Sequence, residues 1–221
     1  MNDLLKKLEG KLIVSCQAYP GEPMRNPETM AQIAAAAEIG GAAAIRCQGL
    51  SDIAAIKGRV QVPVIGLWKE GHDGVYITPS TRHAIACINA GSDIVAIDAT
   101  GRPRPDGTYF EDTVAAIKGK TLIMADCSCK EDVERALAVG VDIVSTTLGG
   151  YVEGTRKTEG PDLEFLTEAV KIAGDTPVFC EGRVHTPAQA RAAIDAGAYS
   201  VVVGTAITHP TSITTWFKEA L

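Results

Sequence analysis

The chain has 221 residues, of which 46% are hydrophobic and 22% are charged, a composition typical of a soluble globular protein. Its formal net charge of −6 argues against a broad nucleic-acid-binding surface, which would require a basic face. No apolar run approaches the roughly 20 residues that a membrane-spanning helix needs, so we expect no membrane association. The N-terminal stretch "MNDLLKKLEGKLIVSC" lacks the features of a signal peptide, and we therefore expect a cytoplasmic protein.

Short apolar segments rich in β-branched residues recur along the chain and predict eight strands. The predicted strands lie at 12–17, 42–48, 62–69, 93–100, 121–127, 142–148, 176–182 and 200–207. Segments with helical spacing alternate with them, and most end near a glycine. The clear helical segments are 27–41, 79–92, 129–141, 161–175 and 186–199, and the weaker ones are 50–59, 111–118 and 211–220.

A glycine precedes several predicted strands by two or three residues, as in "NAGSDIVAID", "AVGVDIVSTT" and "DAGAYSVVVG". This arrangement is typical of the turn between helix and strand in a repeated β/α unit. Eight such units predict an α/β protein with a closed parallel (β/α)8 TIM barrel, and the absence of a linker predicts a single domain over residues 1–221. An open doubly wound sheet is the alternative, but no GxGxxG motif follows the first predicted strand.

The cysteines and histidines do not predict a metal site. The six cysteines lie mostly in apolar segments, and "CSC" at 127–129 lacks the spacing of a CxxC motif, so we expect reduced thiols in the core. No HExxH or HxxxH pattern occurs. A Mg²⁺ site at Asp98 and Asp126 is the less favoured alternative, and we expect neither metal nor cofactor.

In TIM barrels, residues at the carboxyl ends of the strands and in the following loops form the active site. Lys69 ends the apolar segment "PVIGLWK", and Glu181 ends "TPVFCE". We interpret this pair as functional, whereas membership of a structural ring of ion pairs at the barrel mouth remains open for Asp98, Thr146 and Thr147. The polar residues collected in this way are Gln17, Arg46, Lys69, Asp98, Asp126, Thr146, Thr147, Glu181 and Arg183.

The segments after predicted strands seven and eight indicate a phosphate site. "CEGRVHTPAQA" supplies Gly182 ahead of a helix that starts near Thr186, and "VVVGTAITHP" supplies Gly204. Glycines let backbone N–H groups approach an anion, and helix N-termini add positive potential. Phosphate sites recur in these two loops of this fold.

Seven motifs, in this order and spacing, resemble the N-acetylmannosamine-6-phosphate 2-epimerase family over nearly the whole chain. They are "SCQA" at 15–18, "IRCQG" at 45–49, "IGLWK" at 65–69, "MADCS" at 124–128, "TTLGGY" at 146–151, "EGRVHTPAQA" at 181–190 and "VVVGTAIT" at 201–208. The resemblance implies an isomerase of sialic acid and amino-sugar catabolism that needs neither metal nor nucleotide. It would interconvert N-acetylmannosamine 6-phosphate and N-acetylglucosamine 6-phosphate by inverting C2.

The resemblance also implies roles for individual residues. The acid/base positions are Lys69 and Glu181, the sugar-contacting positions are Gln17, Arg46 and Asp126, and the positions around the phosphate are Gly182, Arg183 and Gly204. One departure is His209, which stands where the family commonly has an arginine near the phosphate. How tightly the phosphate would be bound near His209 is therefore an open question.

Inversion at C2 requires removal of a hydrogen next to the C1 carbonyl of the ring-opened sugar and return of a proton to the other face. A lysine in water titrates near 10.4, so we expect burial or a cation such as Arg46 to lower the pKa of Lys69. Glu181, on strand seven, is expected across the mouth from Lys69 on strand three. A Schiff-base aldolase or lyase and a non-catalytic phosphosugar-binding barrel remain alternatives.

The C-terminal segment "SITTWFKEAL" carries two large aromatic residues near the end of the chain. We expect Trp216 and Phe217 to seal either the barrel or a dimer interface. The expected assembly is a homodimer, and the expected partner is a small phosphosugar.

Overall fold

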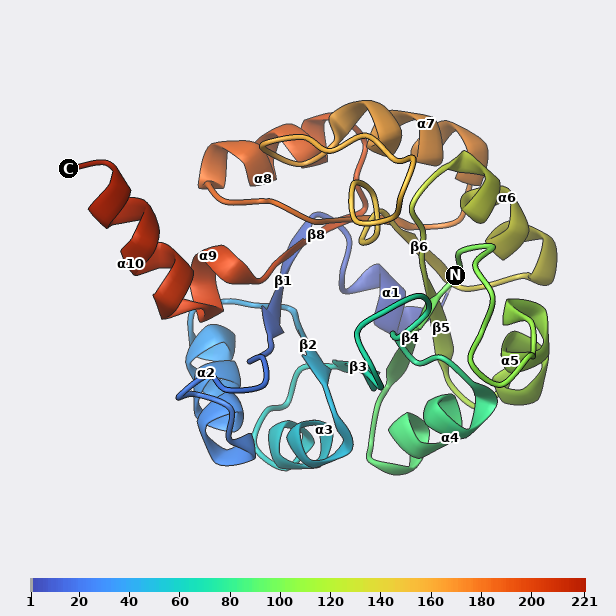
Figure 1. Cartoon of the computed structure of the whole chain (residues 1–221), viewed down its shortest axis with the longest axis horizontal. Coiled ribbons are helices and arrows are strands. Elements are labelled where there is room, and N and C mark those ends of the chain that lie inside the picture. Colours follow the sequence, from blue (N-terminus) through green and yellow to red (C-terminus); the bar gives the residue numbers. More distant parts are fainter. Residues whose placement is uncertain (1) are drawn as a thin grey trace.

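The computed structural model describes residues 2–221 and contains a closed barrel of eight parallel strands, in the order β1 to β8 (Figure 1). This architecture confirms the predicted TIM barrel. The strands are β1 Lys11–Cys16, β2 Ala44–Gln48, β3 Val64–Leu67, β4 Ile94–Asp98, β5 Leu122–Asp126, β6 Ile143–Ser145, β7 Val178–Glu181 and β8 Ser200–Val203. The helices are α1 Asp3–Lys6, α2 Pro27–Ile39, α3 Leu50–Lys57, α4 Thr81–Asn89, α5 Phe110–Ile117, α6 Lys130–Val139, α7 Leu163–Ala173, α8 Pro187–Asp195, α9 Thr205–Thr208 and α10 Pro210–Glu219.

Most strands are shorter than the sequence predicted. β3 ends at Leu67, so Lys69 follows the strand instead of ending it. The predicted strand 200–207 is wrong beyond Val203, because the backbone N–H groups of Ile207 and Thr208 both donate to the Gly204 carbonyl and form α9. The short helix α1 was not predicted.

Successive residues of each strand alternate between the barrel interior and the surrounding helices, as the pleat of a strand requires. The interior is filled by large apolar side chains, including Ile13, Ile65, Ile94, Met124, Ile143, Phe179 and Val202. Toward the carboxyl ends of six of the strands, the inward positions become polar: Ser15, Arg46, Asp98, Asp126, Ser145 and Glu181. At the carboxyl end of the barrel, a layer of polar side chains therefore covers the apolar core.

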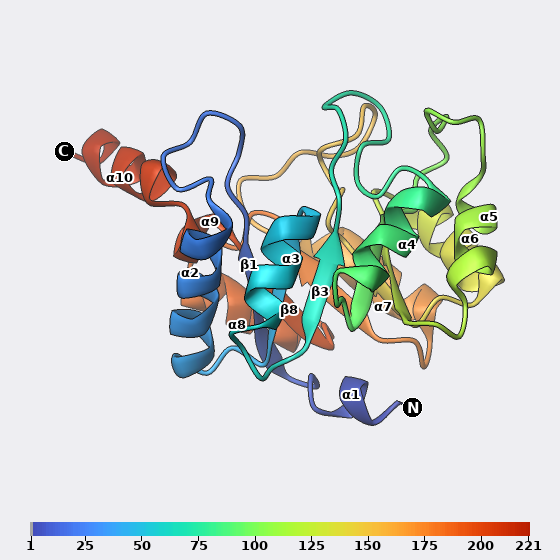
Figure 2. The ribbon, with the colours of Figure 1, turned by 90° about the horizontal axis from the view of Figure 1, so that it is seen from below.

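The amino end of the barrel is closed by α1, which lies across the ends of the strands in Figure 2. Leu5 and Leu8 from this segment are buried against the interior cluster. At the opposite end, the loops that follow the strands rise above the barrel, including the loop between β1 and α2 (Figure 2). The packed core thus leaves the carboxyl end as the place where a ligand can reach inward-facing side chains.

Five of the six cysteines are buried between strands and helices, as predicted, and Cys129 is partly buried. Cys16, Cys47 and Cys180 are buried and free, in the outer cluster that joins the barrel to its helices. Burial raises the pKa of the Cys16 thiol and that of the Cys180 thiol to about 12. These side chains act as small hydrophobic residues.

β3 passes unusually close to the segment that follows α4. A Cβ atom placed on Gly66 would lie 1.9 Å from the Ser92 hydroxyl oxygen and 2.9 Å from the Ile53 side chain. With any other residue here, the Ser92 and Ile53 side chains or β3 itself would have to shift.

The C-terminal helix α10 projects away from the barrel beside α9, as Figure 1 shows. None of its residues is buried, and the side chain of Phe217 is 72% exposed. The Trp216 ring lies 4.7 Å from that of His185, in the segment between β7 and α8. The alternative that this segment seals the barrel is therefore wrong. Among residues 2–221, no helix is both long and apolar enough to cross a bilayer.

Candidate active site

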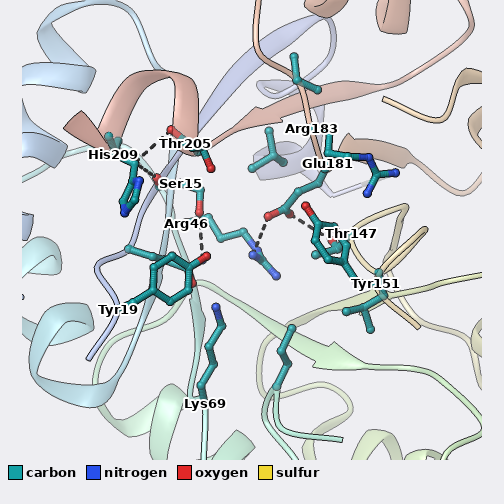
Figure 3. Close-up of a pocket in the computed structure, with 18 of the residues that line it drawn as sticks. Ser15, Tyr19, Arg46, Lys69, Thr147, Tyr151, Glu181, Arg183, Thr205 and His209 are labelled. Atoms are coloured by element: carbon teal, nitrogen blue, oxygen red, sulfur yellow. Dashed lines mark hydrogen bonds and ion pairs between the residues drawn. The ribbon is translucent and has the colours of Figure 1, made fainter. Parts of the chain in front are cut away.

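A pocket lies at the carboxyl end of the barrel, where side chains from several strands and loops point toward one another (Figure 3). Seven of the eight residues expected at the site line it: Gln17, Arg46, Lys69, Glu181, Gly182, Arg183 and Gly204. The eighth, Asp126, is fully buried and does not line the pocket. It lies beneath Arg46, and its contribution in this conformation is to hold that guanidinium.

Arg46 is the electrostatic centre of the site. Its Nη2 donates to Asp126 Oδ2 at 2.5 Å. Its Nη1 donates to Glu181 Oε1 at 2.6 Å, a bond that Figure 3 shows. The Arg46 side chain is only 3% exposed, so the two carboxylates are needed to offset the cost of burying its charge. The three side chains meet because they occupy inward-facing positions toward the carboxyl ends of β2, β5 and β7.

Thr147 connects the two carboxylates. Its hydroxyl lies 2.7 Å from Asp126 Oδ1 and 3.2 Å from Glu181 Oε2. A hydroxyl has one proton, so it cannot donate to both at once. When Glu181 is protonated, it can donate to Thr147, which then donates to Asp126. The site thus offers a place for a proton on Glu181.

Burial is the largest influence on Glu181 and raises its pKa to about 7, against the opposing effect of Arg46. The neighbouring Asp126 raises the pKa of Glu181 further, because a second negative charge nearby disfavours ionisation. Glu181 can therefore hold or release a proton near neutral pH, which is the property required of a general acid or base.

Burial also dominates at Lys69, where it lowers the pKa of the amine to about 8, with Arg46 acting in the same direction. Both causes match the expectation from the sequence. Lys69 forms an isolated antiparallel bridge with Ile77, which fixes its backbone after β3 ends. Its Nζ lies 5.3 Å from the centroid of the Tyr19 ring, and within residues 2–221 it takes part in no ion pair. Figure 3 shows Lys69 and Glu181 on opposite sides of the pocket, with Arg46 between them.

The loops after β7 and β8 supply the glycines of the expected phosphate corner. Gly182 has a φ of +111°, which a residue with a side chain rarely adopts. A Cβ atom on Gly204 would lie 3.3 Å from that of Ser15. The Thr205 side chain lines the pocket beside Gly204. Small residues at these positions leave space for a ligand next to the backbone.

Arg183 borders the same corner, but its side chain is engaged elsewhere. Its guanidinium donates to the carbonyls of Gly160 and Gly149 and to the Thr158 hydroxyl, at 2.9–3.2 Å. It also stacks 5.1 Å from the centroid of the Tyr151 ring. In this conformation Arg183 ties down the loop between β6 and α7, a position that the sequence could not reveal.

The sequence also missed several residues of the pocket, above all aromatic ones. Tyr19, Tyr76 and Tyr151 line its walls, and each lies in a loop that follows a strand. A signal was present, since an aromatic residue in a loop rich in glycine and proline, as in "AYPGEP", is poorly explained by core packing.

The carboxylates at the mouth are paired with arginines. Asp98 Oδ2 accepts from Arg102 at 2.7 Å, and Asp126 accepts from Arg46. A Mg²⁺ ion at these carboxylates would have to displace both guanidinium groups. In the described part of the chain, no three His, Cys, Asp or Glu side chains gather as they would around a metal ion.

Comparisons with known proteins agree with this geometry. Residues 30–221 match the family described as "Putative N-acetylmannosamine-6-phosphate epimerase". A Cutibacterium acnes protein named "Putative N-acetylmannosamine-6-phosphate 2-epimerase" is 56% identical over 99% of this chain and 96% of its own length. The solved N-acetylmannosamine-6-phosphate 2-epimerase of Clostridium perfringens superimposes with a TM-score of 0.95 at 43% identity, covering 100% of this chain and 97% of that one.

A thiamine phosphate pyrophosphorylase of Pyrococcus furiosus is a more distant match, with a TM-score of 0.63 and 17% identity over 96% of this chain and 93% of that one. At that identity the likeness concerns the fold alone. The two close relatives, by contrast, match across all the strands and loops that build the pocket, and the family match covers those from residue 30 onward. The chain belongs to the N-acetylmannosamine-6-phosphate epimerase family.

Proposed function

We propose that this protein interconverts N-acetylmannosamine 6-phosphate and N-acetylglucosamine 6-phosphate by metal-independent proton transfer at C2. The observation that carries the proposal is the pair formed by Lys69 and Glu181. The two groups lie on opposite sides of one pocket, and their pKa values of about 8 and about 7 bring both into the neutral range. Membership of an epimerase family supplies the substrate class.

In one direction, neutral Lys69 removes the proton from C2 of the ring-opened sugar. The electron pair of the C–H bond moves toward the C1 carbonyl and forms an enolate. Protonated Glu181 then donates its proton to C2 from the opposite face. At the end of this step Lys69 is protonated and Glu181 is ionised. The reverse reaction begins from these protonation states. Proton exchange with solvent returns Lys69 to its neutral form and Glu181 to its protonated form for the next forward turnover.

The developing enolate oxygen requires stabilisation, and Arg46 is the cation available between the two groups. Its Nε is buried without a hydrogen-bond partner in the described structure, so this donor remains available to an oxygen of the substrate. The same guanidinium disfavours the protonated form of Lys69, since it is among the causes that lower the pKa of this amine. We assign Arg46 both roles and assign Gln17, whose Oε1 is also buried without a partner, to a hydroxyl or amide of the sugar.

We place the phosphate at the corner formed by Gly182, Gly204 and Thr205. Binding energy at this remote group would hold the reacting carbon between the acid and the base. Unphosphorylated N-acetylmannosamine should therefore be a much poorer substrate. Equal turnover of the two sugars would contradict this placement.

The decisive experiment is incubation of the enzyme with N-acetylmannosamine 6-phosphate in D₂O, with the configuration and deuterium content at C2 read by NMR. We expect N-acetylglucosamine 6-phosphate with deuterium at C2, before and after exhaustive dialysis against EDTA. Failure to form the second epimer would refute the proposal. Activity that is lost on dialysis and restored by Mg²⁺ or Zn²⁺ would refute its metal-independent part.

A Schiff-base lyase is the alternative that the lowered pKa of Lys69 also suits, because a neutral amine can attack a carbonyl. Borohydride reduction in the presence of substrate distinguishes the two. A lyase would be trapped as a covalent adduct on Lys69, whereas the proposed epimerase would remain unmodified and active.

We further propose that the protein acts in the cytoplasm as a homodimer. All six cysteines are free, which suits a reducing compartment. In the C-terminal segment, Phe217 and Leu221 are largely exposed and Trp216 is partly so, and a second copy of the chain would bury them. Light scattering tests the assembly: Phe217→Asp should shift a dimer toward monomer, and a monomeric wild-type protein would contradict it.

A further inference from the structure

The loop between β1 and α2, residues 17–26, forms one wall of the pocket and carries Tyr19. Its own contacts make it compact. The Tyr19 backbone N–H donates to Glu22 Oε2 at 2.7 Å, the Glu22 N–H donates to the Tyr19 carbonyl at 3.1 Å, and the Arg25 guanidinium donates to the Ala18 carbonyl at 2.9 Å. Ala18 and Met24 anchor this compact loop on the outer core cluster. The part that carries Tyr19 and Glu22 is held by contacts from outside the loop.

His209 holds the loop from the other end of the chain. The backbone N–H of Ser212, which can only donate, points to His209 Nδ1 at 3.3 Å, and the Ser212 hydroxyl lies 2.7 Å from the same nitrogen. Nδ1 is therefore the acceptor, and the proton on Nε2 donates to Glu22 Oε1. Both ring nitrogens are thus occupied by the protein, and neither is free for the phosphate.

Tyr19 continues this series of contacts into the pocket. Its ring packs edge-on against His209, with centroids 5.9 Å apart and planes at 78°. The Tyr19 ring also contacts Lys69, whose Nζ lies 5.3 Å from the ring centroid. Figure 3 shows Tyr19 between His209 and Lys69. The start of α10 is in this way connected to the reacting amine.

We propose that His209 is a positioning residue that, through Glu22, straps the loop of residues 17–26 across the pocket and holds Tyr19 against Lys69. Its role here differs from phosphate binding, which its place in the chain would otherwise suggest. We call the hydrogen bond between His209 and Glu22 the strap. Its effect on turnover rests on the proposed function, whereas its effect on the position of the loop does not.

The strap matters because the loop helps to keep Lys69 neutral. The charged groups that face this amine are Arg46 on β2, Asp126 on β5, Glu181 on β7 and Arg25 in the loop. Of these, Arg25 would move away with a released loop, and its positive charge favours the neutral amine. The other three lie on the strands and would stay.

The loop also excludes water from the amine. Burial is the main cause of the lowered pKa of Lys69, so a loop that opens would return this pKa toward its ordinary value. The face of the Tyr19 ring acts in the opposite direction, since it attracts an ammonium group, but burial is the larger influence. Releasing the strap should therefore require a higher pH for the same activity.

The test compares Glu22→Ala, His209→Ala and the double variant with wild type, and measures kcat from pH 6 to pH 10. We expect the rising limb of each single variant to move upward by about one pH unit, which lowers kcat at pH 7 about tenfold and brings kcat close to that of wild type only near pH 10. The double variant should be no worse than either single one, because one contact has been broken twice. His209→Gln keeps a donor for Glu22 and should retain the wild-type limb. Arg191→Ala, which removes an exposed ion pair with Asp195 on α8, is the control.

Three results would overturn the proposal. Losses that multiply in the double variant would mean that the two residues act separately. An unmoved limb in both single variants would mean that the loop does not influence Lys69. Weaker competitive inhibition by inorganic phosphate in His209→Ala, but not in Glu22→Ala, would identify His209 as a phosphate ligand.

A readout without turnover separates this proposal from the proposed function. Cyanate carbamylates neutral amines, so the pH dependence of Lys69 carbamylation, followed by peptide mass spectrometry, reports its ionisation directly. The same upward shift in Glu22→Ala and His209→Ala would support the strap even if wild type failed to epimerise the sugar. An unchanged carbamylation profile would overturn the strap even if wild type were active.

Discussion

Replacing Lys69 with arginine keeps a positive side chain but removes the base. With a pKa of about 8, about one Lys69 in ten is neutral at pH 7. An arginine keeps its proton at any pH at which the protein is folded, so the population of free base at this position becomes negligible. A positioned general base contributes about 10²–10⁴ to a rate, and we expect the loss of kcat in Lys69→Arg to lie in that range.

The assay is conversion of N-acetylmannosamine 6-phosphate in D₂O, with both epimers and their C2 deuterium content followed by NMR. In the direction that starts from neutral Lys69 and protonated Glu181, the wild-type rate should rise with pH below about 7 and fall above about 8. Lys69→Arg should lose the rise as well as the exchange. Lys157→Arg, at an exposed position in the loop between β6 and α7, is the matched control and should behave like wild type. Near wild-type turnover by Lys69→Arg would show that this amine is not the base and would refute the reasoning from its burial.

Three further substitutions examine the groups around Lys69. Glu181→Gln should block inversion but leave Lys69 able to exchange deuterium into one epimer, and inversion at the wild-type rate would exclude Glu181 as the second acid/base group. Thr147→Val should raise the pKa of Glu181 above about 7, because the Thr147 hydroxyl favours the ionised form. The limb of the pH–rate profile that belongs to Glu181 should then move to higher pH, whereas Thr147→Ser should leave it in place; equal shifts in both would contradict this role. Arg46→Met leaves Asp126 and Glu181 buried without their cation, so urea unfolding should show a loss of about 3–5 kcal/mol at neutral pH. A loss below about 1 kcal/mol would mean that the two carboxylates do not depend on Arg46.

The barrel could be predicted because its causes are local. Each strand is a short apolar run, each helix has its own periodicity, and the alternation of the two leaves few architectures. The same regularity placed Lys69 and Glu181 at the mouth, since a charged residue at the end of a buried segment is conspicuous. Strand lengths were less accurate, because "GTAI" after Val203 is as apolar as a strand but folds as a helical turn.

The parts of the site that could not be predicted depend on partners far apart in the sequence. Glu22 and His209 are separated by 187 residues and meet because β8 closes the barrel against β1. The burial of Asp126 beneath Arg46 likewise depends on how far a guanidinium reaches across the barrel. Arg183 was expected at the phosphate, yet its guanidinium donates hydrogen bonds to carbonyls of the loop between β6 and α7. No local pattern encodes these choices.

The packing of Gly66 on the helix-facing side of β3 influences the active site, although Gly66 itself does not line the pocket. Any side chain there would collide with the side chains of Ser92 and Ile53 outside the barrel, and either these side chains or the strand would have to shift to relieve the collision. Lys69 lies three residues further along the same rigid segment and would move with it. For anyone who redesigns this enzyme for other sugars, substitutions in the pocket can be tolerated one at a time, but the outer packing of β3 sets the geometry on which all of them rely.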